Sequence, residues 1–315
     1  MIEPLKYPVF QVRPNGLLIY EVTEWPYKRV KEKNTKTAED HNTTTNNDNK
    51  NTQFYTGQLT PYAKKKLKRA INLLVASSEW KEAEHFKTGK KFKFKVNFIT
   101  LTLPAAQKDV SDKDIKKYCF DNFVKRMKRK HKLHSYVWRA ERQKNGNIHF
   151  HMITDCYIRY DHIRNDWNAV LQRYHFIDDF FEAHGHRNPN STDVHAIQNI
   201  KNLAAYMVKY MSKETPSGDQ ILGKVWDCSQ NLKTKMRCES ILTEEQGEIW
   251  EKALTIPGCY QLHEDRFSMI CMNSDMVMDT LTGKTKSQWK EYLAEVRSPT
   301  EHSMATEVPA VESLR

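Results

Sequence analysis

The spacing of apolar residues changes along the middle of the chain and predicts alternating strands and helices. Residues 91–103 alternate Phe and Val with lysines and continue as an apolar run, which predicts a strand. Residues 112–132 carry apolar side chains every three or four positions, which predicts an amphipathic helix. Two strands, 135–143 and 147–155, are joined through Lys144-Asn145-Gly146, a turn typical of a β-hairpin.

Three further helices are expected around these strands. Thr60-Pro61 supplies a cap and a first-turn proline for a basic helix that ends near residue 77. Helical spacing also covers 161–181 and 194–213, with a polar connection at 187–193. This order of elements favours an α+β fold in which helices flank an antiparallel sheet.

Composition suggests how the chain is divided. An Asn- and Thr-rich stretch without aliphatic core formers suggests a flexible linker after a short N-terminal extension. An acidic C-terminal segment, in which 267–272 reads as a strand and 287–296 as a helix, has no evident role. The expected boundaries are 1–32 for the extension, 33–57 for the linker, 58–239 for the main domain and 240–315 for the acidic segment.

Charge separates the two ends of the chain. The formal net charge is +11, but residues 240–315 carry 13 acidic and 7 basic residues, so residues 1–239 carry +17. Three lysine-rich runs, at 64–69, 90–95 and 125–130, contribute much of this excess. A single run of this kind is commonly just a solvated helix face. Three runs together favour a polyanion, in particular nucleic acid, as the partner.

The same composition argues against membrane and secreted proteins. No run of about 18 uncharged apolar residues is present, and the first residues do not form an apolar signal segment. Six cysteines are scattered without CxxC spacing. We therefore expect a protein of the reducing cytoplasm with no membrane partner.

A metal site is predicted on the second strand of the hairpin. His149 and His151 share one face because strand side chains alternate, while Phe150 points into the core. A three-residue loop with a left-handed Gly146 would set Glu141 opposite His149, whereas a two-residue loop would turn Glu141 to the core face. Two histidines and a carboxylate also match non-haem iron sites, so the ligands alone do not identify the metal.

Two tyrosines on the helix at 194–213 are candidate nucleophiles. Tyr206 and Tyr210 lie one turn apart on the basic side of the helix, and each is followed three residues later by a lysine, Lys209 and Lys213. A single tyrosine there would be an ordinary boundary residue. A phenol with a reference pKa of about 10 needs nearby positive charge to gain phenolate character, and the lysines and a metal could supply it.

Together these motifs resemble the HUH endonucleases, and among them the two-tyrosine rolling-circle replication initiators of single-stranded DNA phages and plasmids. The resemblance covers about residues 90–235. It rests on three features in order: the strand from Phe98 to Leu103, Glu141 before His149-Phe150-His151, and Tyr206-x3-Tyr210 with their lysines. It implies a ferredoxin-like or RRM-like sandwich with N- and C-terminal extensions.

The resemblance also implies an activity. Glu141, His149 and His151 would hold Mg²⁺ or Mn²⁺, although imidazole ligands by themselves lean towards Zn. Tyr206 or Tyr210 would attack one DNA strand and leave a 5′-phosphotyrosine and a free 3′-hydroxyl. No other cofactor is implied, and the departure at Met278 from a phosphate-binding loop ending at Gly283-Lys284-Thr285 argues against an ATPase.

The implied partners are single-stranded DNA at a replication origin and host replication proteins such as a helicase and a polymerase. In a phage protein, the site of action would be the host cytoplasm. Two alternatives remain open from the sequence. One is a transposase or relaxase of the same superfamily, and the other is a module that binds single-stranded DNA without cutting it.

Overall fold

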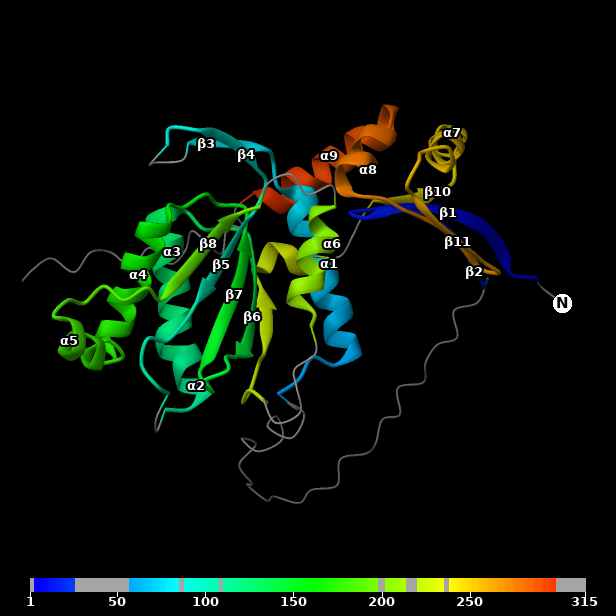
Figure 1. The fold of residues 1–315 in the computed structure, drawn as a ribbon. Coiled ribbons are helices and arrows are strands. Elements are labelled where there is room, and N and C mark those ends of the chain that lie inside the picture. The colour runs from blue at the N-terminus through cyan, green and yellow to red at the C-terminus, as the bar shows by residue number, and fades with distance from the viewer. Residues whose placement is uncertain are drawn as a thin grey trace, which may run out of the picture.

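The computed structural model describes residues 3–25, 57–84, 88–107, 110–197, 202–213, 220–234 and 238–298. Two five-stranded antiparallel sheets and a two-stranded hairpin, with helices packed against them, confirm the predicted α+β class (Figure 1). Residues 33–56 of the expected linker lie outside the described residues. Within the described residues, no helix is long and apolar enough to cross a membrane.

The first sheet contains the predicted hairpin at its centre. Its strands follow the order β8-β5-β7-β6-β9. Glu141 lies opposite His149, and Gln143 pairs with Asn147 around a three-residue loop in which Gly146 has a φ of 84°. The predicted loop length and register are therefore confirmed. The strands are β5 (Asn97–Leu101), β6 (Tyr136–Arg142), β7 (Ile148–Thr154), β8 (Thr192–Ala196) and β9 (Trp226–Cys228).

Helices lie on both sides of this sheet (Figure 1). On one side Phe150 stacks on Phe120 at 4.4 Å between ring centroids and meets Trp167 edge-on, so this side is apolar core. Its helices are α2 (Asp112–Asp114), the π-helix η2 (Ile115–Phe120), α3 (Asp121–His131) and α4 (Tyr160–Arg173). On the other side α1 (Pro61–Ser77) and α6 (Leu203–Met211) pack against each other.

Helix α1 begins where the sequence predicts. Thr60 caps it by accepting a hydrogen bond from the backbone N–H of Ala63, and Pro61 occupies the first turn. Leu67, Ile71 and Leu74 are fully buried on one side of the helix. Its basic residues are left towards solvent, as expected for an amphipathic surface helix.

The second sheet joins the two ends of the described chain. Its order is β10-β1-β2-β12-β11, and Leu18 of β2 pairs with Met269 of β12. The N-terminal strands and the acidic C-terminal segment therefore share one sheet. Its elements are β1 (Leu5–Arg13), β2 (Gly16–Glu24), β10 (Glu239–Ile241), β11 (Tyr260–Glu264), β12 (Phe267–Cys271), α7 (Glu244–Leu254), α8 (Ser274–Thr280) and α9 (Gly283–Arg297). The short η3 (Gln230–Lys233) leads into this part of the chain.

Three predicted elements differ from the structure. The strand at 91–103 divides into β4 (Lys91–Phe94), which pairs with β3 (Lys81–Glu84), and β5. The break falls at Lys95, whose buried ammonium is turned to Asp275 at 2.8 Å. The helix at 161–181 divides into α4 and α5 (Asp178–His184), because His175 takes a φ of 62°, which no α-helix accommodates.

The expected connection at 187–193 and helix at 194–213 also need correction. Residues Thr192–Ala196 form the edge strand β8, and the helix begins only at Leu203. Asp193 and His195 point away from the core while Val194 lies against it, a period of two that the sequence pattern obscured. The helix that carries both tyrosines is consequently shorter than predicted.

Candidate metal and tyrosine site

Three potential metal ligands converge on the face of the first sheet opposite the apolar core. The Nε2 atoms of His149 and His151 lie 3.8 and 3.5 Å from Oε2 of Glu141, and one ligand atom from each residue falls within 4.8 Å of the others. All three side chains are between 15 and 23% exposed. The strand pairing explains this convergence, because directly opposite residues on neighbouring strands share a face.

The contacts within the cluster leave room for a cation. Neither ring nitrogen of His149 has a hydrogen-bond partner among the described residues, and the 3.8 Å gap to Glu141 is too long for one. Buried polar atoms without partners are costly, so a bound ion accounts for this arrangement well. Burial raises the pKa of Glu141, but the imidazoles and Arg139 outweigh it and hold that pKa well below its usual range. The carboxylate is therefore ready to ligate a metal.

A neighbouring strand orients the second histidine. Thr100 of β5 lies opposite His151, and its Oγ1 is 3.1 Å from Nδ1 of the ring. Phe98 stacks on the same ring with centroids 5.1 Å apart. These contacts leave Nε2 directed to Glu141, in the manner of residues that support a metal-binding histidine. The strand motif seen in the sequence thus includes a supporting role for Thr100.

Arg139 connects the metal ligands to the tyrosine helix. Its side chain is 1% exposed, its Nε lies 3.2 Å from Oε1 of Glu141, and its Nη1 donates to the backbone carbonyl of Met211 at 2.7 Å. Met211 is the last residue of α6. The sequence analysis did not select Arg139, although its position two residues before Glu141 already placed it on the same face.

The two tyrosines form a pair on α6. Their ring centroids are 4.6 Å apart, and Tyr210 is 39% exposed while Tyr206 is half-buried. A hydrogen bond with Tyr210 raises the pKa of Tyr206. Lys213 places its ammonium 4.9 Å from the centre of the Tyr210 ring, whereas Lys209 is exposed on the helix surface. Of the two predicted lysines, Lys213 is the one in contact with a tyrosine ring.

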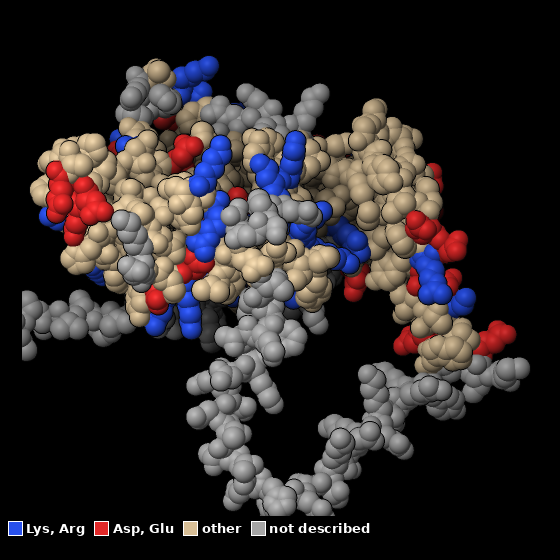
Figure 2. Space-filling model, turned by 60° about the horizontal axis from the view of Figure 1, so that its bottom comes forward, with Lys and Arg blue, Asp and Glu red and all other residues tan. Residues whose placement is uncertain are grey.

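Surface charge is unevenly distributed around this site. Figure 2 shows Lys and Arg side chains gathered over the middle of the molecule, in the region where Figure 1 places α1 and α6. The larger groups of Asp and Glu on the same face lie towards its two sides. The positive field predicted from the sequence is therefore concentrated beside the candidate site.

One comparison with known proteins bears on this region. Residues 96–215 match the model of a family described as replication-associated protein ORF2. No curated protein and no solved structure matches the chain significantly. The matched segment runs from β5 through α6 and so contains all three metal ligands and both tyrosines. The similarity supports a role as a replication initiator that binds origin DNA.

Proposed function

We propose that this chain is an HUH endonuclease of the two-tyrosine type that starts rolling-circle replication by nicking single-stranded DNA. The observation that carries the proposal is the bridge through Arg139, which contacts Glu141 with one nitrogen and the end of α6 with another. Through it the ligand cluster and the tyrosine helix share one face of the sheet. A divalent cation between the ligands would polarise the scissile phosphate and stabilise the leaving oxygen.

The chain's own residues account for the rest of the transfer. The phenol oxygen of one tyrosine forms a bond to phosphorus as the bond from phosphorus to the 3′ oxygen breaks. The phenol proton leaves to solvent, and the 3′ oxygen takes up a proton. One phosphodiester replaces another, so no nucleotide is hydrolysed. The product is a 5′-phosphotyrosine and a 3′-hydroxyl from which a host polymerase, aided by a helicase, would extend.

The two tyrosines differ in a way that suggests an order of use. Tyr210 is the more exposed ring and has Lys213 beside it. Tyr206 is harder to ionise because its hydrogen bond with Tyr210 raises its pKa. We therefore assign the first attack to Tyr210 and the later strand transfer, which closes a unit-length circle, to Tyr206. Lys213 would stabilise negative charge on Tyr210, and Lys209 would contact the DNA backbone.

Covalent capture of DNA tests this function. The protein is incubated with labelled single-stranded DNA from its own replicon and Mn²⁺, and adducts are separated on a denaturing gel. The wild type should form an adduct, Tyr210→Phe should form it at least 10-fold more slowly, and the double Tyr206→Phe, Tyr210→Phe variant should form none. An adduct that persists in the double variant would remove the tyrosines from the mechanism. Binding without any adduct from the wild type would instead favour the non-cutting DNA-binding module.

A further inference from the structure

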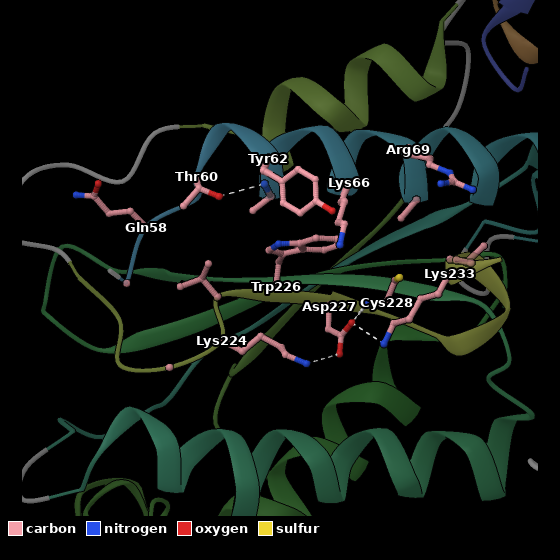
Figure 3. A pocket seen from close by; sticks show the side chains of 16 residues that line it. Gln58, Thr60, Tyr62, Lys66, Arg69, Lys224, Trp226, Asp227, Cys228 and Lys233 are labelled. Atoms are coloured by element: carbon pink, nitrogen blue, oxygen red, sulfur yellow. Dashed lines mark hydrogen bonds and ion pairs between the residues drawn. The ribbon is translucent and has the colours of Figure 1, made fainter. Parts of the chain in front are cut away.

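A groove of about 490 Å³ opens beside the candidate site, between the first half of α1 and the edge strand β9 (Figure 3). Figure 3 shows Trp226 pointing from β9 towards α1, where Tyr62 and Lys66 lie above it. The match to the replication-associated family ends at residue 215, before β9 begins. The groove therefore lies partly outside the region that the comparison covers.

The groove is positively charged. Four of the residues that line it are cationic, Lys66, Arg69, Lys224 and Lys233, and one is acidic, Asp227. Lys224 and Lys233 both contact Asp227, at 2.8 and 2.9 Å, so one carboxylate is shared between two ammonium groups. The lining retains an excess of positive charge, which favours an anionic ligand.

Aromatic rings accompany these charges. Tyr62 is 68% exposed, and the ammonium of Lys66 sits 4.5 Å from the centre of its ring. Trp226 is half-buried on the groove wall. Stacking platforms interleaved with lysines are the usual composition of surfaces that hold single-stranded nucleic acid, because bases stack on rings while phosphates meet ammonium groups.

The groove follows on from the metal ligands across the sheet. Trp226 lies opposite Arg139 on β6, and Arg139 lies opposite His151 on β7. Three residues in register across neighbouring strands share one face, and two strand spacings place Trp226 about 10 Å from His151. A DNA strand whose scissile phosphate lies at the ligands needs only a short continuation to reach the groove.

Buried polar contacts hold the loop at the mouth of the groove. The ammonium of Lys116 donates to the backbone carbonyls of Leu222 and Lys224. The backbone N–H of Leu222 donates to Asp112 at 3.0 Å, and Asp112 is itself buried and paired with Arg142. Groups from η2, α2 and β6 thus fix this loop in advance, which lowers the cost of ordering it around a ligand.

We propose that this groove binds the single-stranded DNA that flanks the nick, with phosphates on Lys66 and Lys233 and a base stacked on Trp226 or Tyr62. The proposal deepens, and rests on, the nicking function, because it names where the rest of the substrate lies. The groove supplies binding energy away from the reacting phosphate. It should therefore change the affinity for DNA and leave the chemical step itself unaltered.

Binding measured without metal separates the groove from the chemistry. Fluorescence anisotropy with a labelled 20-nucleotide oligonucleotide in EDTA reports affinity when no cleavage can occur. Lys66→Ala and Lys233→Ala should each weaken binding several-fold and lower the slope of log Kd against log salt by about 0.7, the value for one phosphate contact on a single strand. Lys290→Ala on α9, an exposed lysine of the other sheet's helices, is the matched control. Equal slopes in all four proteins would overturn the groove assignment.

Photo-crosslinking locates the bases directly. An oligonucleotide with 5-iodouracil at successive positions is irradiated with the full-length protein, and the crosslinked peptides are mapped. Crosslinks at Trp226 or Tyr62 are expected, and Trp226→Leu should remove the first of them. Crosslinks confined to the second sheet would overturn the proposal.

The two proposals fail in different ways. Loss of the groove would leave the wild-type adduct intact while the lysine variants bind DNA normally. Loss of the nicking function would leave the wild type without an adduct while the lysine variants still bind less tightly. In single-turnover cleavage, Lys66→Ala should raise the protein concentration that gives half-maximal rate but reach the wild-type rate at saturation.

Discussion

The two five-stranded sheets of this protein treat polar side chains in opposite ways. In the second sheet, Glu239 accepts hydrogen bonds from Gln11 and Tyr20 at 2.7 and 3.1 Å on an exposed surface. In the first sheet, His149 and Glu141 are largely buried, and His149 makes no hydrogen bond within the described residues. One sheet satisfies its polar groups at the rim, while the other keeps them unsatisfied on a covered face.

This contrast indicates where function imposes a cost on stability. Burying polar atoms without partners destabilises a fold, and a stable sheet would replace them with apolar residues, as the opposite face does at Phe150. Retaining such atoms is typical of sites in which a ligand supplies the missing partner. Changes at the metal cluster should therefore affect catalysis and metal binding strongly but stability little.

The largest expected effect is that of His149→Phe. Replacing a metal ligand should slow covalent adduct formation by more than about 100-fold, beyond the loss typical of supporting residues. In EDTA, its free energy of unfolding by urea should stay within about 1 kcal/mol of the wild type or rise, because no hydrogen bond is lost. Tyr20→Phe, a polar change in the second sheet, should leave the rate unchanged. A large loss of stability in His149→Phe would make the histidine structural.

Metal binding should stabilise the wild type and not the variant. At a free Mn²⁺ concentration 100 times Kd, binding to the folded state adds about 2.7 kcal/mol to the free energy of unfolding. A thermal melt with and without Mn²⁺ measures this as an increase in Tm. His149→Phe should lose most of the increase, and an equal increase in both proteins would place the ion elsewhere.

Arg139→Lys tests the bridge between the ligands and α6. Lysine keeps the charge but cannot contact both Glu141 and the carbonyl of Met211 with a planar fork. We expect a 10- to 100-fold loss of Mn²⁺ affinity or cleavage rate, estimated from other residues that support metal ligands. Arg142→Lys is the matched control, because Arg142 lies on the same strand but pairs with Asp112. If both variants lose Mn²⁺ affinity equally, Arg139 has no specific positioning role.

The metal cluster could be predicted from the sequence because its geometry is local. A turn at Lys144-Asn145-Gly146 and a side-chain period of two are enough to set Glu141 opposite His149. The edge strand β8 could not be separated from the following helix, since Val194 and Ile197 fit both periods. Its strand character comes from pairing with β5, nearly a hundred residues earlier in the chain.

The second sheet and the groove were not predictable for a related reason. No local pattern states that β2 should pair with β12, about 250 residues later. Trp226 becomes a groove residue only because α1 lies over β9. Side chains whose neighbours come from distant segments need the tertiary structure to be recognised, even where, as for Lys66, their chemistry is plain in the sequence.

The smallest expected effect concerns Lys116, which holds the loop of the groove. Burial lowers its pKa to about 8, partly opposed by Asp112 and reinforced by Arg142. Below that pH the lysine is protonated in both the folded and the unfolded chain, so it contributes no pH dependence. Between about pH 8 and 10.5 the unfolded chain binds more protons, and the free energy of unfolding should rise with pH through this residue.

Lys116→Met isolates that contribution. The difference in free energy of unfolding between wild type and variant, measured in urea at pH 7, 9 and 10, should become more favourable to the wild type as pH rises. Lys117→Met, at the exposed neighbouring position, should show a constant difference. A constant difference in Lys116→Met as well would mean that the ammonium is solvated in the folded protein. The loop at Leu222 would then depend on Asp112 alone, and the preorganisation of the groove would rest on a single contact.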